Sequence, residues 1–198
     1  AQGIGLLRTE FLFLRRDTPP GEEEQLALYR QVIQAMEGRR VVIRTLDLGS
    51  DKRAPWMSGP REDNPALGLR GIRRSLARPE LFSTQLRAIL RAAAEGETAV
   101  MFPVVTSPEE VLQARALLDQ CRARLEEENL PAGPVEAGVM IETPAAALLA
   151  GELARVSDFF SIGSNDLAQY TLAMDRQDPA CDPRHPAVLE LIRRSALE

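Results

Sequence analysis

The sequence predicts an α/β fold built around a parallel β-sheet. Short apolar segments alternate with amphipathic helical segments about five times along the 198 residues, with a long excursion after the second apolar segment. The apolar segments are continuous, which indicates strands that are buried on both faces, as in a sheet covered by helices. A (β/α)8 barrel and an open, doubly wound sheet both fit this pattern, because hydrophobic periodicity does not distinguish them.

In the first half of the chain we expect strands at residues 3–7, 41–43 and 99–102 and helices at 22–37 and 79–95. The first helix has apolar residues at near-helical spacing, namely Leu26, Tyr29, Ile33 and Met36. The second helix has a similar apolar face, formed by Phe82, Leu86, Ile89 and Ala93. A glycine follows each helix, which is a common stop signal.

The second half continues the alternation, with strands at 135–141 and 159–162 and helices after Ser107, after Thr143, at 165–171 and at 186–197. Ser107 and Glu110 form a capping-box pattern, and Pro108 suits the first helical turn. Thr143 followed by Pro144 is a good helix start whatever the function.

Composition and charge exclude several classes of protein. The chain has 24 basic and 29 acidic residues, and the resulting net charge of −5 argues against nucleic-acid binding. Apolar residues make up 44% and charged residues 27%, as in an ordinary globular protein. No apolar run is long enough to span a bilayer and no signal-peptide pattern is present. Cys121 and Cys181 form neither a disulfide framework nor a zinc motif, so we expect a cytoplasmic protein.

Polar residues follow four of the predicted strands. They are Arg8-Thr9-Glu10, Arg44-Thr45-Leu46-Asp47, Glu142-Thr143-Pro144 and Gly163-Ser164-Asn165-Asp166. The carboxyl ends of parallel strands meet at one side of the sheet, where α/β proteins bind ligands. Two carboxylates there are typical of a Mg²⁺ site, and several arginines are typical of a pocket for a multiply anionic ligand. Phosphoryl transfer needs both the metal site and the anion pocket, because charge on the transferred group must be neutralised and the group held in position.

Structural explanations remain open for the same residues. An arginine in this Arg-rich chain is often an ion-paired surface residue, and Asn165 or Asp166 before a helix is often only an N-cap. The residue pattern alone therefore leaves the functional and the structural interpretation about equally supported.

Six segments, in this order, resemble the motifs of one known family: 3–13, 44–52, 64–73, 139–146, 159–167 and 169–176. The chain is similar to the C-terminal, phosphoenolpyruvate-binding domain of the phosphoenolpyruvate–protein phosphotransferases, the Enzyme I family of the bacterial sugar phosphotransferase system. The resemblance implies a (β/α)8 TIM barrel of the phosphoenolpyruvate/pyruvate superfamily. It implies that residues 1–198 form a partial barrel domain, with about five of eight strands and without the phosphoacceptor-histidine domain. The absence of an initial Met and the helical pattern at the end agree with this expectation.

The resemblance also implies a reaction and its residues. Glu142 and Asp166 match the family's Mg²⁺ ligands. Five further residues match the substrate-binding set: Arg8, Arg44, Arg70, Asn165 and Arg176. Arg70 matches an arginine near the substrate carboxylate, and the others match residues around the phosphoryl group. The reaction would transfer the phosphoryl group of phosphoenolpyruvate to a histidine of a separate domain, then to a histidine-containing phosphocarrier protein that feeds sugar uptake. A homodimer without membrane insertion is implied.

Two catalytic features of the family have no match here, so no catalytic residue is assigned. His185, at a helix start, is interpreted as structural and not as the phosphoacceptor. Cys121 lies on an apolar helix face and Cys181 in a loop, and neither is in the family's Gly-rich cysteine motif. We therefore expect this chain to be inactive by itself. Three alternatives stay open: a domain like that of pyruvate phosphate dikinase or phosphoenolpyruvate synthase, a non-catalytic binding or dimerisation fragment, and a lyase acting through a pyruvate enolate.

Overall fold

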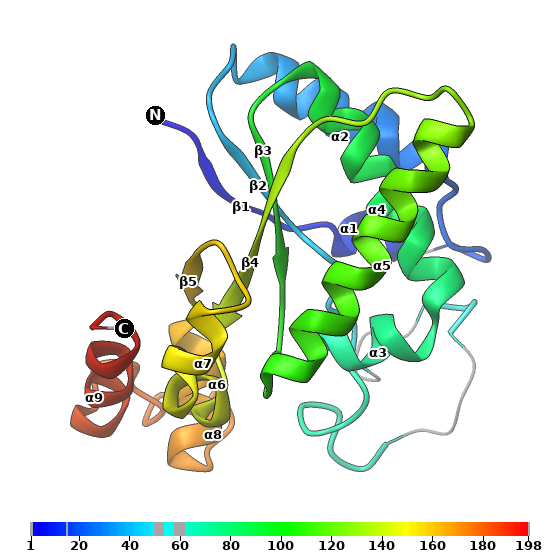
Figure 1. The fold of residues 1–198 in the computed structure, drawn as a ribbon. Helices are drawn as coiled ribbons and strands as arrows, with labels where there is room; N and C mark the ends of the chain where they lie inside the picture. Colours follow the sequence, from blue (N-terminus) through cyan, green and yellow to red (C-terminus); the bar gives the residue numbers. More distant parts are fainter. Residues whose placement is uncertain (1, 15, 50–53, 58–61, 198) are drawn as a thin grey trace.

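Five parallel strands form one sheet in the computed structural model, which describes residues 2–14, 16–49, 54–57 and 62–197 (Figure 1). The strands are β1 (Ile4–Leu7), β2 (Val41–Arg44), β3 (Thr98–Phe102), β4 (Val135–Ile141) and β5 (Phe160–Ile162). They lie side by side in chain order, and every neighbouring pair is parallel. β2 and β3 are buried along their whole length, as their continuous apolar sequences predict.

The helices follow the strands in alternation. In chain order they are α1 (Glu10–Phe13), α2 (Glu22–Ala35), α3 (Gly71–Ala77), α4 (Pro79–Ala92), α5 (Pro108–Glu127), α6 (Pro144–Leu148), α7 (Ala150–Ala154), α8 (Ser164–Leu172) and α9 (Pro186–Ser195). In Figure 1, α2, α4 and α5 lie together on one side of the sheet, and α6 to α9 gather beside β5. Within the described ranges, no helix is both long and apolar enough to cross a membrane.

The strand order distinguishes the two predicted architectures. A doubly wound sheet reverses its strand order at a switch point and carries helices on both faces. Here the order runs from β1 to β5 without reversal, and the long helices lie on one side (Figure 1). The five strands therefore form a half-barrel, and the prediction of an incomplete (β/α)8 barrel is confirmed.

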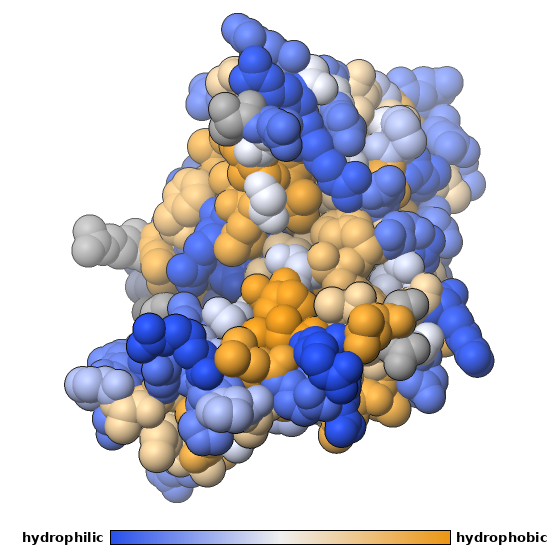
Figure 2. Space-filling model, turned by 90° about the vertical axis from the view of Figure 1, so that its left-hand side faces the viewer, coloured by the Kyte–Doolittle hydropathy of each residue, from blue (hydrophilic) through white to orange (hydrophobic). Residues whose placement is uncertain are grey.

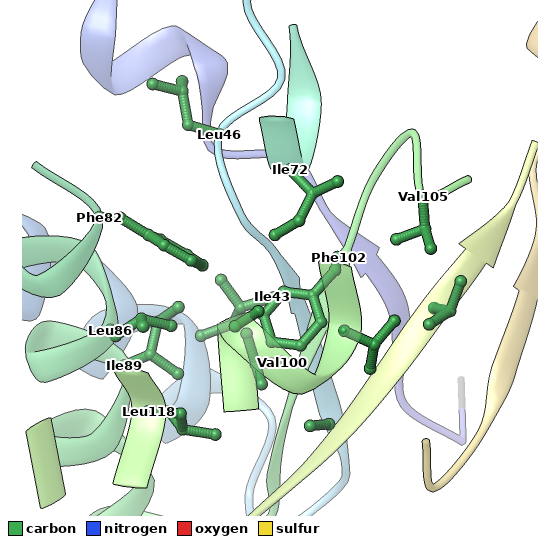
Figure 3. Close-up of a cluster of buried hydrophobic side chains, with 14 of the residues drawn as sticks. Ile43, Leu46, Ile72, Phe82, Leu86, Ile89, Val100, Phe102, Val105 and Leu118 are labelled. Carbon is green, nitrogen blue, oxygen red and sulfur yellow. The ribbon is translucent and has the colours of Figure 1, made fainter. Parts of the chain in front are cut away.

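The two faces of the sheet carry different clusters. The main core lies between the sheet and the helices, where Ile43, Val100 and Phe102 face helix residues that include Phe82 and Leu86 (Figure 3). Intervening strand residues point to the other face and form a smaller apolar cluster: Val42, Ala99, Met101 and Met140, with Phe159 packed against them. Figure 2 views the molecule from that side and shows apolar side chains gathered between polar ones.

Several predicted boundaries shift in the structure. The helix expected at 22–37 ends at Ala35, because Glu37 and Gly38 take left-handed backbone conformations (φ 52° and 81°). The helix expected at 79–95 ends in a 3₁₀ turn, Ala93–Glu95. The helix after Thr143 is divided into α6 and α7, and the short helices α1 and α3 were not predicted.

The predicted caps and isolated residues have structural roles. Thr143 Oγ1 accepts a hydrogen bond from the Ala146 N–H at 3.0 Å, so it caps α6. His185 Nδ1 accepts from the Ala187 N–H at 3.2 Å and caps α9, as a structural histidine would. Cys121 lies in the core, and Cys181 is also buried and unpaired.

Candidate functional site

The carboxyl ends of β1, β2, β4 and β5 line a pocket of about 440 Å³. Strand alternation explains the convergence: Arg8 follows Leu6, Arg44 follows Val42 and Glu142 follows Met140 at a spacing of two, so each pair shares the inner face. All seven site residues predicted from the sequence line this pocket: Arg8, Arg44, Arg70, Glu142, Asn165, Asp166 and Arg176. The structure brings them together, and their chemical roles stay predictions.

Arg70 is held by two buried carboxylates. Its Nε and Nη2 donate to Asp47 Oδ1 and Oδ2 at 2.9 and 2.7 Å, and Nη2 also donates to Asp166 Oδ2 at 3.1 Å. Burial by itself raises the pKa of Asp47, but the bonds and charge of Arg70, with the charge of Arg44, outweigh burial and lower that pKa. Asp47 therefore remains an anion that fixes one edge of the Arg70 guanidinium.

Arg44 keeps donor capacity that only weak or no acceptors use among the described residues. Its Nη2 donates to Glu10 Oε1 at 2.7 Å, and its Nη1 contacts Met140 Sδ at 3.7 Å. Its Nε is buried and has no hydrogen-bond partner among the described residues. A thioether sulfur is a weak acceptor, so the Nη1 group of this pocket-lining arginine suits a bound anion. Burial by itself lowers the pKa of Arg44, but the charges of Glu10 and Asp47 outweigh burial and raise that pKa, which keeps Arg44 cationic.

Asp166 lies in the first turn of α8 and connects two arginines. Its Oδ1 accepts from Arg176 Nη1 at 2.8 Å, and its Oδ2 accepts from Arg70. The N-cap of α8 is Gly163, so the interpretation of Asn165 or Asp166 as an N-cap is wrong. Asp166 is buried because the two guanidinium groups compensate its charge.

Arg8 and Asn165 differ from the other pocket residues in exposure. The Arg8 side chain is 58% exposed and its Nε lies 3.4 Å from Glu10 Oε2. Asn165 is also exposed where it lines the pocket. Both side chains are open to solvent where they line the pocket, so a ligand there can contact them.

Glu142 is a buried carboxyl in a crowded, negatively charged environment. Its Oε1 accepts from the Val104 N–H at 2.7 Å. Burial raises its pKa to about 8, and the neighbouring Asp47 and Asp166 carboxylates add to the effect, while Arg44 opposes it. Gly163 makes room for this carboxyl, since a Cβ there would lie 2.6 Å from Glu142 Cβ and 2.8 Å from Oε2.

The donor set at Glu142 and Asp166 fits a hard divalent cation. Carboxylate oxygens are the ligands that Mg²⁺ prefers, and it commonly uses only one or two of them, completed by water and substrate phosphate. The Glu142 carboxyl and the Asp47 and Asp166 carboxylates repel one another when all are charged, and a bound dication would relieve this repulsion. Within the described ranges, no group of three or more His, Cys, Asp or Glu side chains forms a complete metal cage.

Four residues of this site were not assigned a role from the sequence. Glu10 and Asp47 follow predicted strands, so their position was a usable signal. Tyr170, which contacts Arg70, could be found only through a weaker signal. It lies four residues after Asp166 on a predicted helix, and this spacing places the two on the same helix face. Val104 has a positive φ of 58°, which no local pattern predicts for a β-branched residue. The motif residues Ser50, Asp51 and Lys52 lie outside the described residues.

Comparisons with known proteins identify the family of the chain. The family described as "PEP-utilising enzyme, PEP-binding domain" matches residues 1–196. The chain is 52% identical to the multiphosphoryl transfer protein of Rhodobacter capsulatus over 196 residues, which are 97% of the chain and 23% of that protein. It is 51% identical to the phosphoenolpyruvate–protein phosphotransferase of Haemophilus influenzae over 98% of the chain and 35% of that protein. The chain thus spans about a quarter to a third of these relatives.

One solved structure supports the fold. The citrate lyase of Burkholderia xenovorans superimposes with a TM-score of 0.52 at 16% identity, over 99% of this chain and 59% of that one. At this identity the likeness concerns the backbone architecture alone.

Proposed function

The chain belongs to the family of phosphoenolpyruvate-binding domains of PEP-utilising enzymes, and from this membership we propose that it binds phosphoenolpyruvate for phosphoryl transfer to a protein histidine. One observation carries the proposal. Four arginines and three buried carboxylates, from segments far apart in the sequence, line a single pocket. This combination binds a small molecule that has both a phosphate and a carboxylate group.

The arginines divide into two groups by their existing bonds. Arg44 lines the pocket, and among the described residues its Nη1 has only the weak acceptor Met140 Sδ, while Arg8 is exposed, so both offer donors to a phosphate. Arg176 is partly exposed while it holds Asp166, and it can share its remaining donors with the same anion. Arg70 is more fully engaged by Asp47 and Asp166. Its role in the proposal is to place a positive charge at the substrate carboxylate and to hold the acidic residues in place.

Mg²⁺ is part of the proposal. Glu142 and Asp166 would hold it, and it would neutralise charge on the phosphate and carboxylate of the substrate. Gly163 and the Val104 N–H orient the Glu142 carboxyl for this task. The Arg70 and Arg176 guanidiniums fix the two oxygens of Asp166, so both carboxylates are positioned in advance.

The wider activity belongs to longer proteins. Relatives three to four times as long are named phosphoenolpyruvate–protein phosphotransferase and multiphosphoryl transfer protein. By analogy we propose that the phosphoacceptor histidine and a histidine-containing phosphocarrier act together with this domain in sugar uptake, as a cytoplasmic homodimer. His185 is engaged as a helix cap, so the proposal gives it no role as acceptor, and the 198 residues by themselves are proposed to bind without turnover.

Calorimetry tests the proposal directly. We expect heat of binding when phosphoenolpyruvate or oxalate is titrated into the chain with Mg²⁺, and much less heat without Mg²⁺. Glu142→Ala should abolish the metal-dependent part, because it removes one of two proposed ligands. Glu126→Ala, an exposed position on α5, is the matched control. A wild-type chain without metal-dependent heat, or a Glu142→Ala chain with an unaltered response, contradicts the proposal.

A further inference from the structure

Tyr170 connects α8 with the segment that carries Ala66 and Arg70, and both of these elements contribute residues to the pocket. It lies on α8, four residues after Asp166, so both side chains lie on the same face of the helix. Its hydroxyl donates to the Ala66 carbonyl oxygen and accepts from Arg70 Nη1 at 3.2 Å. One oxygen therefore joins α8 to a segment about 100 residues earlier in the chain.

The segment that Tyr170 contacts forms part of the pocket wall. Residues 62–70 have no helix or strand, and Pro65 and Ala66 line the pocket. Two of its backbone hydrogen bonds are local: the Leu67 and Gly68 N–H groups donate to the carbonyl oxygens of Asn64 and Pro65, at 2.9 and 3.3 Å. These bonds shape the turn, and among the described residues the segment is joined to α8 by the Arg70–Asp166 bond and by the Tyr170 hydroxyl. The Tyr170 hydroxyl reaches from α8 to the Ala66 carbonyl oxygen of this segment.

The same hydroxyl completes the surroundings of Arg70. Asp47 and Asp166 take up Nε and Nη2, and Tyr170 takes one hydrogen of Nη1. Acceptors on three sides leave the guanidinium little freedom to rotate, and among the described residues one Nη1 hydrogen has no acceptor and is available to a ligand. Because Tyr170 does not itself line the pocket, it acts through Arg70 and Ala66 and not on the substrate.

We propose that Tyr170 is a positioning residue: its hydroxyl fastens the 62–70 segment to α8 and so sets Arg70 and the Ala66 wall at a fixed distance from Asp166. This inference rests on the proposed function, since the fixed geometry matters for binding phosphoenolpyruvate with Mg²⁺. Hydrogen bonds from a supporting side chain are the usual means of holding a binding residue in place.

The test is Tyr170→Phe, which removes one oxygen atom, with Tyr29→Phe as the matched control. Tyr29 is the other tyrosine of the chain, fully buried and hydrogen-bonded to Gln25 and Gln85 away from the pocket. We expect Tyr170→Phe to weaken calorimetric binding of phosphoenolpyruvate in the presence of Mg²⁺ by about tenfold, the loss expected for about one net hydrogen bond. Tyr29→Phe should lower the melting temperature and leave this affinity unchanged.

Hydrogen exchange gives a local readout that separates this inference from the proposed function. In Tyr170→Phe we expect the Leu67, Gly68 and Leu69 amides to exchange about tenfold faster and the α4 amides to exchange at unchanged rates. In Tyr29→Phe the same three amides should keep their wild-type exchange rates. Unchanged exchange at these amides overturns the proposal whether or not the wild-type chain binds phosphoenolpyruvate. Faster exchange together with wild-type affinity overturns it too, because the contact would then be structural only. If the wild-type chain does not bind, the proposed function fails, and with it the positioning role.

Discussion

Replacing Asp47 by asparagine tests how the buried charges of the pocket stabilise the fold. The Asp47 and Arg70 side chains are 3% and 8% exposed, and two hydrogen bonds of 2.9 and 2.7 Å join them. Removing one partner of such a pair costs about 3–5 kcal/mol, because the remaining charge is left uncompensated. The amide introduced by Asp47→Asn would still offer one neutral acceptor, and Arg70 would keep Asp166, so we expect a loss near the lower limit, about 3 kcal/mol.

The assay is urea unfolding at pH 7 supported by thermal melting. For a chain of this size, a loss of about 3 kcal/mol corresponds to a melting temperature lower by roughly 6–12 °C. Asp119→Asn, on the exposed surface of α5, is the control and should change the free energy of unfolding by less than about 0.5 kcal/mol.

The pH dependence gives a second, independent readout. The folded pKa of Asp47 is lowered, so its contribution is fully present above the unfolded pKa of about 3.9 and is lost as the pH falls through the folded value. The difference in unfolding free energy between wild type and Asp47→Asn should therefore narrow below about pH 4. A difference under about 1 kcal/mol at pH 7, or an equal difference at pH 7 and pH 3, would refute the reasoning.

Three further predictions concern the pocket. The folded pKa of Glu142 is raised to about 8, so its contribution to stability is present below its unfolded pKa of about 4.3 and is lost as the pH rises through 8. Urea unfolding without Mg²⁺ should show the free energy of unfolding falling by up to about 1.4 kcal/mol per pH unit. Both Glu142→Gln and added Mg²⁺ should reduce this slope. An unaltered slope in both cases counts against the raised pKa of Glu142. Gly163→Ala should destabilise the chain by about 1–3 kcal/mol in urea unfolding, because the new Cβ overlaps Glu142, whereas Gly5→Ala, with open space at its Cβ, should cost far less. Arg44→Lys should weaken phosphoenolpyruvate binding in calorimetry by about tenfold or more, because an ammonium group cannot replace the planar fork, and Arg73→Lys on the exposed face of α3 should have no effect; equal affinities of the two variants would contradict the role of Arg44.

Local patterns were sufficient for most of the secondary structure. Continuous apolar runs predicted β2 and β3, and spacing of apolar residues predicted α2 and α4. The short helices α1 and α3 were missed because neither has enough residues to show a period. The boundary at Ala35 shifted because two left-handed residues, Glu37 and Gly38, end the helix before the apolar pattern does.

The order of residues along the chain was enough to establish which side chains lie at the strand ends. A spacing of two along a strand fixes the face of the sheet to which each side chain points. Periodicity is the same in a barrel and in a doubly wound sheet, so the residue pattern did not choose between them. The family resemblance implied the barrel, and the strand order and the side covered by helices confirm it. The pairing of Arg70 with Asp47 and the contact of Tyr170 with Ala66 needed the folded chain. These bonds join residues 23 and 104 positions apart, and a local pattern cannot record a contact that exists only after the chain has closed on itself.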